Sequence, residues 1–419
     1  MTRAVPGSPG RPLGRRRRRV VITGTGAVGP FGAGTGALLE GIVAGRSPLE
    51  RIDGCCCAPV RDPLAAGPFP PNAWRRLDRA SRMAVLASAE ALAEAGHDPA
   101  SPDRAALPEG GVVLGTMTAG TGPLHGFLST LFTQGPEAVS PMDFPFTVHN
   151  APAGQCAILL GLKGPNLTTC RMEASGLAAI ALAADLVRGG AADAVLAGGV
   201  DERVPIVTEA WRRWRVVSRG APESYRGPFD RGRRGFAPGE GAYCVVLEES
   251  ERARARGARP WAEIRAAATA HAPSEPHRWP DDPAAPARAI AGALAEAELG
   301  TKDLGYIVAS ANGSPRLDRL EARALREALG PAARRVPISG LKGAVGESGA
   351  SSACGAVVAA LSIRDGFIPP VARLVDPEPD LGLDLVLGGP RRGPVPAVLV
   401  HALGAGGSCV ALILSRFRP

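Results

Sequence analysis

Aromatic residues are scarce in this chain of 419 residues, where Phe, Trp and Tyr together make up only 4%. Apolar residues still amount to 45%, so we expect a core built from Ala, Val, Leu and Ile at close approach. No run of about 18 apolar residues occurs, which argues against a transmembrane helix and a membrane partner. The basic start lacks the apolar segment of a secretory signal. A cytoplasmic protein is therefore predicted.

Lysine is also rare, with three residues, and the positive charge is carried by arginine. Residues 1–19 contain seven arginines and no acid, so they supply seven of the eight net positive charges. The rest of the chain is nearly neutral, which disfavours a nucleic-acid partner. We predict a solvated, disordered basic tail over residues 1–19. The other arginines reflect a general preference for Arg over Lys in this sequence and indicate little about binding partners.

The eight cysteines form no CxxC pattern, and three of them are adjacent at Cys55, Cys56 and Cys57. This spacing predicts reduced thiols and no zinc site. Five others lie among small or apolar residues and are predicted to fill the core: Cys156, Cys170, Cys244, Cys354 and Cys409. The histidines at 125, 149 and 401 form no spaced ligand set, so neither a metal nor a cofactor is expected.

Short apolar strands alternate with Ala-rich helices, which predicts a layered α/β fold. The predicted strands cover residues 20–24, 111–115, 194–197, 243–247, 261–270, 306–309, 397–401 and 408–414. The predicted helices cover residues 81–96, 177–188, 284–297, 316–329 and 350–364, with a charged, exposed helical segment at 248–256. Pro-rich segments at 58–73 and 272–285 are predicted to be surface loops. The chain divides into two α/β halves, 20–256 and 257–419.

Residues 24–29 match the pattern GxGxxG directly after a predicted strand. That pattern can form the phosphate cradle of a dinucleotide fold only where a helix begins at once. Here Pro30 and further glycines follow, so the dinucleotide interpretation is disfavoured.

The segment 164–177 runs from a strand through a sharp turn into a helix, with Glu173 at the turn. Such an elbow commonly presents a nucleophile whose negative charge is stabilised by the helix dipole. This one presents a carboxylate.

Six sequence blocks, in order, resemble the β-ketoacyl synthase family. They are residues 20–24, the elbow with Gly164-Pro165 and Glu173-Ala174-Ser175-Gly176, residues 192–201, residues 227–242, Lys342 with Gly346, and Gly404-Ala405-Gly406-Gly407. The resemblance implies a thiolase-like fold in which two similar αβ halves give an αβαβα layering. It also implies a Cys nucleophile and two His in an active member.

None of these three catalytic residues is present. Glu173 stands at the Cys position, Asn312 at the first His position and Glu347 at the second, close to Lys342. A carboxylate is a poor nucleophile toward thioesters, and without imidazoles no neutral donor pair faces a developing enolate. Condensation by this chain alone is therefore not expected. Cys170 is not expected to substitute, because it lies three residues before Glu173 and its side chain should point to the opposite face of an extended strand.

The departures resemble the chain length factors, the ketosynthase-like subunits of type II polyketide synthases. The shared feature is a shortened loop, here Gly313-Ser314-Pro315-Arg316-Leu317-Asp318-Arg319, in which Ser314-Pro315 replaces two Thr that hold the carrier's pantetheine arm in active members. These relatives usually carry Gln at the elbow. Glu173 can accept a hydrogen bond as Gln does but cannot donate one while ionised, which disfavours a decarboxylating role that depends on Gln. The alternative is that the helix N-terminus or a neighbouring Arg stabilises Glu173 as part of an inactive site.

The resemblance implies a partner and a role. The partner is an active ketosynthase in a heterodimer, and through it an acyl carrier protein, and the role is to cap the acyl tunnel and so set polyketide chain length. A stretch resembling the tunnel-lining helix contains Leu124, Phe127, Leu128 and Phe132. Two alternatives remain open: a decarboxylase of malonyl carrier protein that primes the pathway, and an acyl-binding scaffold without catalysis.

Overall fold

A computed structural model describes residues 18–99, 107 and 109–419. Most of the predicted tail therefore lies outside the described residues. Its last two arginines belong to the folded body, because Arg18 pairs with Asp193 at 2.8 Å and Arg19 with Glu263 at 2.7 Å.

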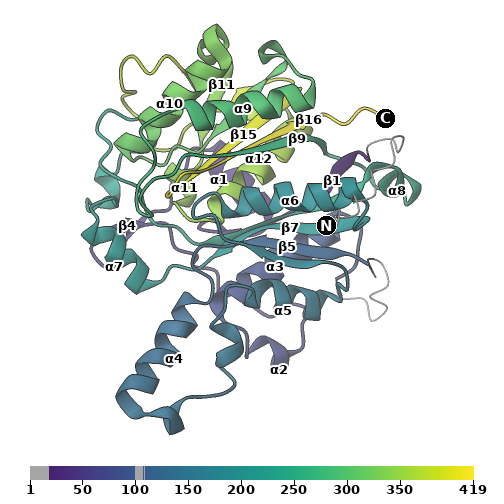
Figure 1. Cartoon of the computed structure of the whole chain (residues 1–419), viewed down its shortest axis with the longest axis vertical. Helices are drawn as coiled ribbons and strands as arrows, with labels where there is room; N and C mark the ends of the chain where they lie inside the picture. The colour runs from purple at the N-terminus through teal and green to yellow at the C-terminus, as the bar shows by residue number, and fades with distance from the viewer. Residues whose placement is uncertain (1–17, 100–106, 108) are drawn as a thin grey trace, which may run out of the picture.

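Strands from both halves of the sequence join edge to edge. Within the described residues, twelve strands form one sheet in the order β13-β11-β10-β15-β16-β9-β1-β8-β7-β5-β6, with β2 paired to β1 outside this path (Figure 1). The strands of the N-terminal half are β1 (Val20–Gly29), β2 (Gly32–Ala33), β5 (Gly111–Gly115), β6 (Asn166–Thr169), β7 (Ala194–Asp201) and β8 (Gly241–Glu249). Those of the C-terminal half are β9 (Ala262–His271), β10 (Tyr306–Ala309), β11 (Pro337–Gly340), β13 (Asp384–Leu385), β15 (Ala397–Gly404) and β16 (Ser408–Ser415). Two small ribbons complete the strands: β3 (Glu50–Ile52) with β4 (Cys55–Cys57), and β12 (Phe367–Ile368) with β14 (Arg391–Arg392).

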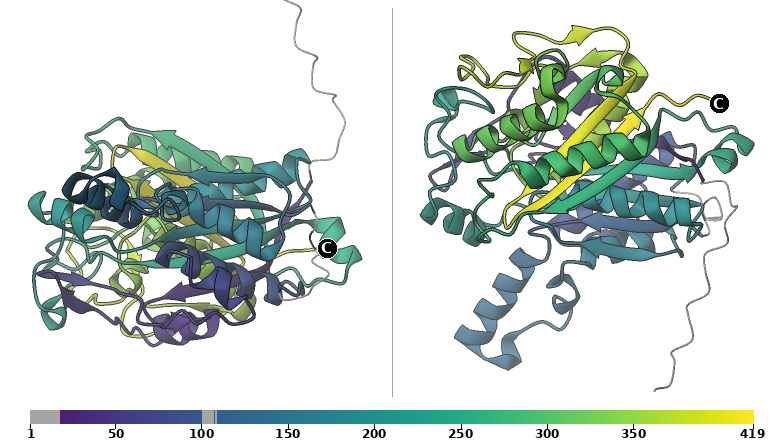
Figure 2. Two further views of the ribbon diagram at one scale, coloured as in Figure 1. Left: turned by 90° about the horizontal axis from the view of Figure 1, so that it is seen from below. Right: turned by 45° about the horizontal axis from the view of Figure 1, so that its top comes forward.

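The helices form layers on and between the two sets of strands. The helices are α1 (Thr35–Val43), α2 (Pro71–Trp74), α3 (Arg79–Glu94), α4 (Thr121–Gln134), α5 (Ala151–Leu160), α6 (Ser175–Gly189), α7 (Pro205–Arg213), α8 (Ser250–Ala255), α9 (Ala284–Ala297), α10 (Pro315–Leu329), α11 (Lys342–Val345) and α12 (Ser351–Asp365). Among these elements, α3 and α5 cover one outer face, and α9 and α10 cover the other, where α9 lies across the C-terminal strands (Figure 2). Between the two sets of strands lie α6 and α12, and α12 contacts both β8 and β15. This is the αβαβα layering that the sequence predicts.

The core follows these layers. The middle layer is packed mainly with Ala, Val, Leu and Ile from α6, α12 and the strands on either side. Helix α12 is buried over thirteen of its fifteen residues, as a helix enclosed between two sheets must be. The low aromatic content is thus matched by close contacts between small side chains.

The GxGxxG pattern lies inside β1 and forms no loop. An added Cβ at Gly24 would lie 2.1 Å from the carbonyl oxygen of Ala91, and one at Gly26 would lie 1.9 Å from that of Ala87. These glycines let β1 lie directly against the backbone of α3. The dinucleotide interpretation has no structural basis here.

Two sequence predictions about burial are wrong. Glu248 and Glu249 lie buried at the end of β8, because Arg256 pairs with Glu248 and the Glu249 side chain caps α8. Cys170 is exposed, whereas the other four cysteines predicted to fill the core are buried, as are Cys55, Cys56 and Cys57. The small residues around Cys170 form the turn after β6 and are not part of the core.

No helix in the described residues is both long and apolar enough to cross a bilayer.

Candidate functional site

The elbow at Glu173 is a tight turn between the edge strand β6 and the buried helix α6. Met172 takes a left-handed backbone conformation with φ of 50°, which is uncommon for a residue with a side chain. The Ser175 hydroxyl locks the turn, since it accepts from the Arg171 amide at 2.8 Å and donates to the Met172 carbonyl at 2.6 Å. Glu173 is therefore held directly before the first turn of α6.

The Glu173 carboxylate is buried, with 2% of the residue exposed. Its Oε2 accepts a hydrogen bond from the backbone amide of Ala405, 2.7 Å away, in the turn between β15 and β16. Burial raises the pKa of Glu173 to about 7, and the negative charge of Glu347 acts in the same direction, while the Ala405 amide opposes it. The carboxyl group of Glu173 therefore titrates near neutral pH.

Glu347 is the centre of a buried hydrogen-bond network. Its carboxylate accepts hydrogen bonds from the Lys342 ammonium at 2.9 Å, the side-chain amide of Asn312 at 2.7 Å and the Ser351 hydroxyl at 3.0 Å. Burial raises the pKa of Glu347, and the positive charge of Lys342 counteracts this most strongly. The structure thus brings together all four predicted site residues, Glu173, Asn312, Lys342 and Glu347.

The loop carrying Asn312 is fixed by two buried carboxylates of α10. Glu321 accepts from the amides of Ser310 and Ala311 at 2.7 and 2.6 Å, and Asp318 accepts from the Asn312 amide at 3.0 Å. Asp318 is also paired with Arg233 at 2.9 Å. The shortened loop is therefore rigidly anchored where a substrate-binding loop would need to present free hydroxyls.

These contacts define what the site can do chemically. The Asn312 amide, which stands where the first His is expected, already donates to Glu347, and Asn312 and Glu347 are both fully buried. A carboxylate at the elbow forms no stable thioester, and the amide groups are committed to internal partners. The side chains of the site are thus occupied by hydrogen bonds to one another.

Two members of the site were not identified from the sequence. The backbone amide of Ala405 and the hydroxyl of Ser351 donate hydrogen bonds to Glu173 and Glu347. Small residues in glycine-rich or Ala-rich segments are common in any fold, so their residue type does not indicate a functional site. No arginine is among the groups that most shift the pKa of Glu173, and the neighbouring charge with the largest effect is Glu347. Cys170 is exposed and lies after the end of β6, whereas Glu173 is buried.

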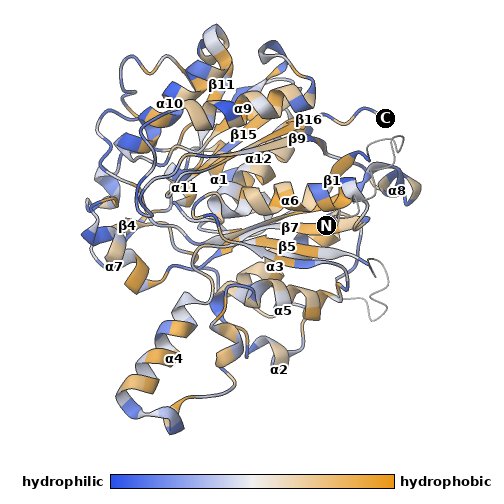
Figure 3. Ribbon diagram, in the orientation of Figure 1, coloured by the Kyte–Doolittle hydropathy of each residue, from blue (hydrophilic) through white to orange (hydrophobic). Residues whose placement is uncertain are grey.

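The four predicted tunnel residues lie on α4, which projects from the body of the molecule (Figure 1). No α4 residue is buried: Leu124 is 39% exposed and Phe132 81%. Phe127 packs edge-on against Phe144, with 5.8 Å between the ring centroids. Hydrophobic residues recur along the ribbon of this helix (Figure 3). The set therefore lies apart from the buried Glu173 network, on a helix that leaves large apolar side chains uncovered in this chain.

Two family models match successive parts of the chain. Residues 62–253 match the model of the beta-ketoacyl synthase N-terminal domain, and residues 261–374 match that of the C-terminal domain. The chain is 34% identical to the tetracenomycin polyketide synthase ketoacyl synthase alpha subunit of Streptomyces glaucescens, over 95% of this chain and 97% of that protein. It is 31% identical to 3-oxoacyl-[acyl-carrier-protein] synthase 2 of Coxiella burnetii, over 96% of this chain and 99% of that protein.

Solved structures of ketosynthases have a similar fold. The structure titled "The ishigamide ketosynthase/chain length factor" is similar with a TM-score of 0.86 and 26% identity, covering 96% of this chain and all of that chain. A beta-ketoacyl synthase from Burkholderia phymatum is similar with a TM-score of 0.88 and 28% identity, over 96% of this chain and all of that one. With both family domains matched in order and relatives above 30% identity over nearly the whole length, the chain belongs to the β-ketoacyl synthase family.

Proposed function

We propose that this chain is a non-condensing subunit of a type II polyketide synthase. In this proposal it pairs with an active ketosynthase, receives no acyl group itself, and limits the length of the polyketide by closing the end of the acyl tunnel. The acyl carrier protein reaches it only through the complex. The observation that carries the proposal is the buried cluster of Glu173, Asn312, Lys342 and Glu347, in which a carboxylate, an amide and a second carboxylate stand where the family resemblance places a Cys and two His.

The uncovered surface supports a permanent partner. Strand β6 is the last strand of the sheet order, and Leu167 on it is 39% exposed. Half of the exposed large apolar residues in the described part of the chain lie on α4 and the segment that follows it: Leu124, Leu128, Phe132, Met142, Phe144 and Val148. An open sheet edge together with a projecting helix that exposes large apolar side chains is unusual for a protein that works alone. A ketosynthase with the same fold could continue the sheet across β6 and cover α4.

The α4 side chains would then enclose the end of the partner's tunnel. Overfilling a packed wall costs roughly 1 to 3 kcal/mol, which is enough to stop elongation at a set length. Replacing Leu124, Phe127, Leu128 and Phe132 by Ala, singly and together, in a reconstituted complex should lengthen the product by at least one extension unit. His125→Ala, on the same helix, is the matched control and should leave product mass unchanged. Unchanged product length across the whole apolar set would remove α4 from the mechanism.

A decarboxylase that primes the pathway is the second candidate, and one observation favours it. Because the pKa of Glu173 is raised to about 7, its carboxyl group is partly protonated at neutral pH and can donate a hydrogen bond as Gln would. The purified chain mixed with malonyl carrier protein should then release carbon dioxide without a partner, and Glu173→Ala should abolish the release. Release that is unaffected by Glu173→Ala would count against this role for the elbow.

The remaining alternative, an acyl-binding scaffold, predicts a different assembly. Such a protein would stay monomeric when mixed with the cognate ketosynthase. Size measurement of the mixture separates it from the proposed subunit.

A further inference from the structure

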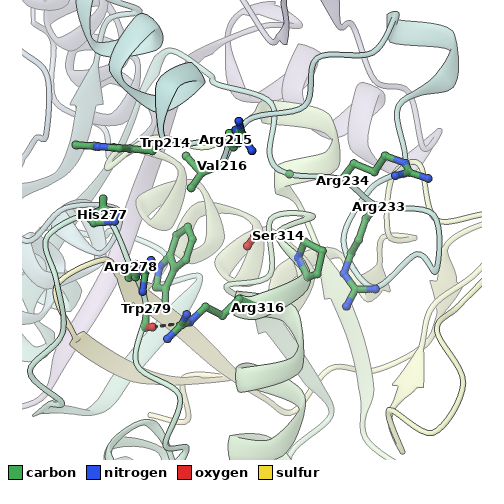
Figure 4. A pocket seen from close by; sticks show the side chains of 12 residues that line it. Trp214, Arg215, Val216, Arg233, Arg234, His277, Arg278, Trp279, Ser314 and Arg316 are labelled. Carbon is green, nitrogen blue, oxygen red and sulfur yellow. Dashed lines mark hydrogen bonds between the residues drawn. The ribbon is translucent and has the colours of Figure 1, made fainter.

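The contacts of the buried cluster continue in two directions beyond its four residues. In one direction, the backbone amide of Ser314 donates to the Oδ1 of Asn312 at 2.8 Å, and Ser314 lines a surface pocket of about 570 Å³ (Figure 4). Arg215, Arg234 and Trp279 line the same pocket. This direction ends at the shortened loop already described. The other direction passes through the start of α12 and reaches α4.

Helix α4 is not positioned by burial of its own side chains. None of its residues is buried, and of residues 121–150 only Thr147 is buried. Most helices in folded proteins are held in place by an apolar face that packs against the body. The placement of α4 in this chain therefore depends on the segments that connect it to the body.

The two ends of the projecting segment meet at its base. The Nδ1 of His149 lies 2.5 Å from the carbonyl oxygen of Ala119. Gly120 packs so closely against Val148 that an added Cβ would lie 2.8 Å from the Val148 carbonyl oxygen. Both ends are therefore fixed by residues 116–120, which join β5 to α4.

Asp201 holds residues 116–118 of this base. It is the last residue of β7 and is fully buried. Its Oδ1 accepts hydrogen bonds from the backbone amides of Met117 and Thr118 at 2.8 and 2.7 Å. The same oxygen accepts from the Thr116 hydroxyl at 2.7 Å, and the Thr118 hydroxyl donates to the Glu202 carbonyl at 2.7 Å. One carboxylate oxygen thus binds three consecutive residues.

The other oxygen of this carboxylate faces the buried cluster. It accepts a hydrogen bond at 3.0 Å from the amide of Ala350, directly before α12. In the same turn, the Ser351 hydroxyl donates to Glu347 at 3.0 Å. The carbonyl of Gly349 accepts from the Gly176 amide in the first turn of α6, also at 3.0 Å. The turn before α12 therefore contacts the base of α4 on one side and the cluster on the other.

A buried carboxylate that joins two segments in this way resists their separation. Hydrogen bonds to an ionised acceptor are stronger than those between neutral groups. Moving the Ala350 amide away from Asp201 would leave a buried carboxylate oxygen without its donor, and such an unpaired polar group is costly. The turn before α12 and the base of α4 are therefore expected to shift together.

We propose that Asp201 is a positioning residue that couples the buried cluster to α4. The residues at the family's catalytic positions then form the foundation that fixes where α4 projects. The coupling itself concerns only the placement of α4. It rests on the proposed function for one consequence, namely that a displaced α4 changes the length of the product.

Hydrogen exchange of the isolated full chain tests the coupling without a ketosynthase. Asp201→Asn keeps the shape of the side chain and one carbonyl oxygen, but its NH₂ group cannot accept from the Ala350 amide. The amides of residues 116–134 should then exchange roughly tenfold faster or more, because a hydrogen bond to a charged group is lost. Exchange in α9 should keep its wild-type rate.

Ser351→Ala is the second variant, and it decides the question if Asp201→Asn does not fold. It removes the hydroxyl that joins the turn before α12 to Glu347 and leaves Asp201 unchanged. If the buried cluster is coupled to α4, this variant should also speed exchange at residues 116–134, by a smaller factor.

The matched control is Asp230→Asn. Asp230 is also buried and also joins two segments through backbone amides, because it accepts from Gly232 and Val375, both at 2.8 Å. Neither of these segments belongs to α4, to its base or to α12. The control should therefore leave exchange at residues 116–134 unchanged.

Product analysis in a reconstituted complex separates positioning from a purely structural role. Asp201→Asn should give polyketides of more than one length, because α4 no longer has a single placement. A residue that only stabilises the fold would lower the yield and leave the product length unchanged, as Asp230→Asn should.

Unchanged exchange at residues 116–134 in both Asp201→Asn and Ser351→Ala would overturn the inference. An equal acceleration in α9, or in the Asp230→Asn control, would overturn it as well. The two proposals also fail separately. Faster exchange in α4, together with an unchanged product after replacement of its four apolar residues, would keep the coupling and remove the chain-length role. A longer product from that apolar set, with unchanged exchange in α4, would do the reverse.

Discussion

At the scale of single residues, the site holds two buried carboxylates, Glu173 and Glu347, and one ammonium, Lys342. Lys342 neutralises Glu347 at 2.9 Å, whereas Glu173 accepts from the backbone amide of Ala405 and forms no ion pair with a described residue. A buried carboxyl group without a full counter-charge favours its protonated form. The raised pKa of Glu173 thus follows first from its burial and then from the negative charge of Glu347.

This pKa predicts how stability depends on pH. The pKa of Glu173 lies near 7 in the folded protein and near 4.5 in the unfolded chain. The folded state therefore binds more protons between these values, so its contribution is fully present below about pH 4.5 and is lost as pH rises through about 7. Glu173→Gln should leave stability unchanged at pH 4.5 and raise it at pH 8, by up to about 3 kcal/mol. Urea unfolding at both values measures this difference.

The control for that experiment is Glu137→Gln, because Glu137 is an exposed acid outside the site. It should change stability little at either pH. A Glu173→Gln variant that is less stable than the wild type at pH 8 would contradict the raised pKa.

The buried ion pair gives a second residue-scale prediction. Lys342→Ala leaves Glu347 without its counter-charge and should destabilise the protein by about 3 to 5 kcal/mol. Lys342→Met combined with Glu347→Gln should cost much less, because no uncompensated charge remains. A double-mutant cycle of unfolding free energies tests this. Arg46→Ala, which breaks an exposed pair with Glu40, should cost less than about 1 kcal/mol.

At the scale of elements, the sequence pattern predicted the bounds of several strands and helices but not the burial of the residues at their ends. The helices 284–297 and 316–329 and the strand 306–309 agree with α9, α10 and β10 within a residue. Periodicity and glycine stops are local signals, and they suffice there. Whether Glu248 is exposed depends on Arg256 folding back onto it, which is a tertiary contact that no local pattern encodes.

The site shows the same limit. Glu173, Asn312, Lys342 and Glu347 could be found because the surrounding glycines and small residues resemble the family's blocks. The surface arginines could not be interpreted, because their frequency is high throughout the chain. Only the fold reveals that Arg215 and Arg234 face a cavity without acids.

The contact between β1 and α3 gives a prediction at this scale. A Cβ at Gly26 would lie 1.9 Å from the Ala87 carbonyl oxygen, so Gly26→Ala must push the strand and the helix apart. We expect a loss of more than about 3 kcal/mol or failure to fold. Gly36→Ala in α1 meets nothing within 4 Å and should be neutral or stabilise the protein by up to about 1 kcal/mol. Thermal unfolding of both variants would contradict this account if they behaved alike.

At the scale of the whole molecule, the uncovered surface lies at one end of the sheet. Leu167→Lys places a charge on the exposed edge strand β6 and should prevent pairing with the ketosynthase, while the isolated chain stays folded. Leu387→Lys is the control, because Leu387 is also exposed and follows β13 at the opposite end of the sheet order, and it should leave pairing intact. Sedimentation of the mixed subunits measures the outcome. Pairing that survives Leu167→Lys would show that the edge is not part of the interface.

The sheet order also bears on synthesis at the ribosome. β1 pairs with β8 and β9, besides a short contact with β2, and β9 pairs in turn with β16, which ends at Ser415. The two long neighbours of β1 are complete only once residue 271 has been synthesised, and β9 keeps one open edge until β16 follows. A nascent chain that stops before residue 408 therefore exposes an unpaired strand edge at β9, which makes it prone to aggregation.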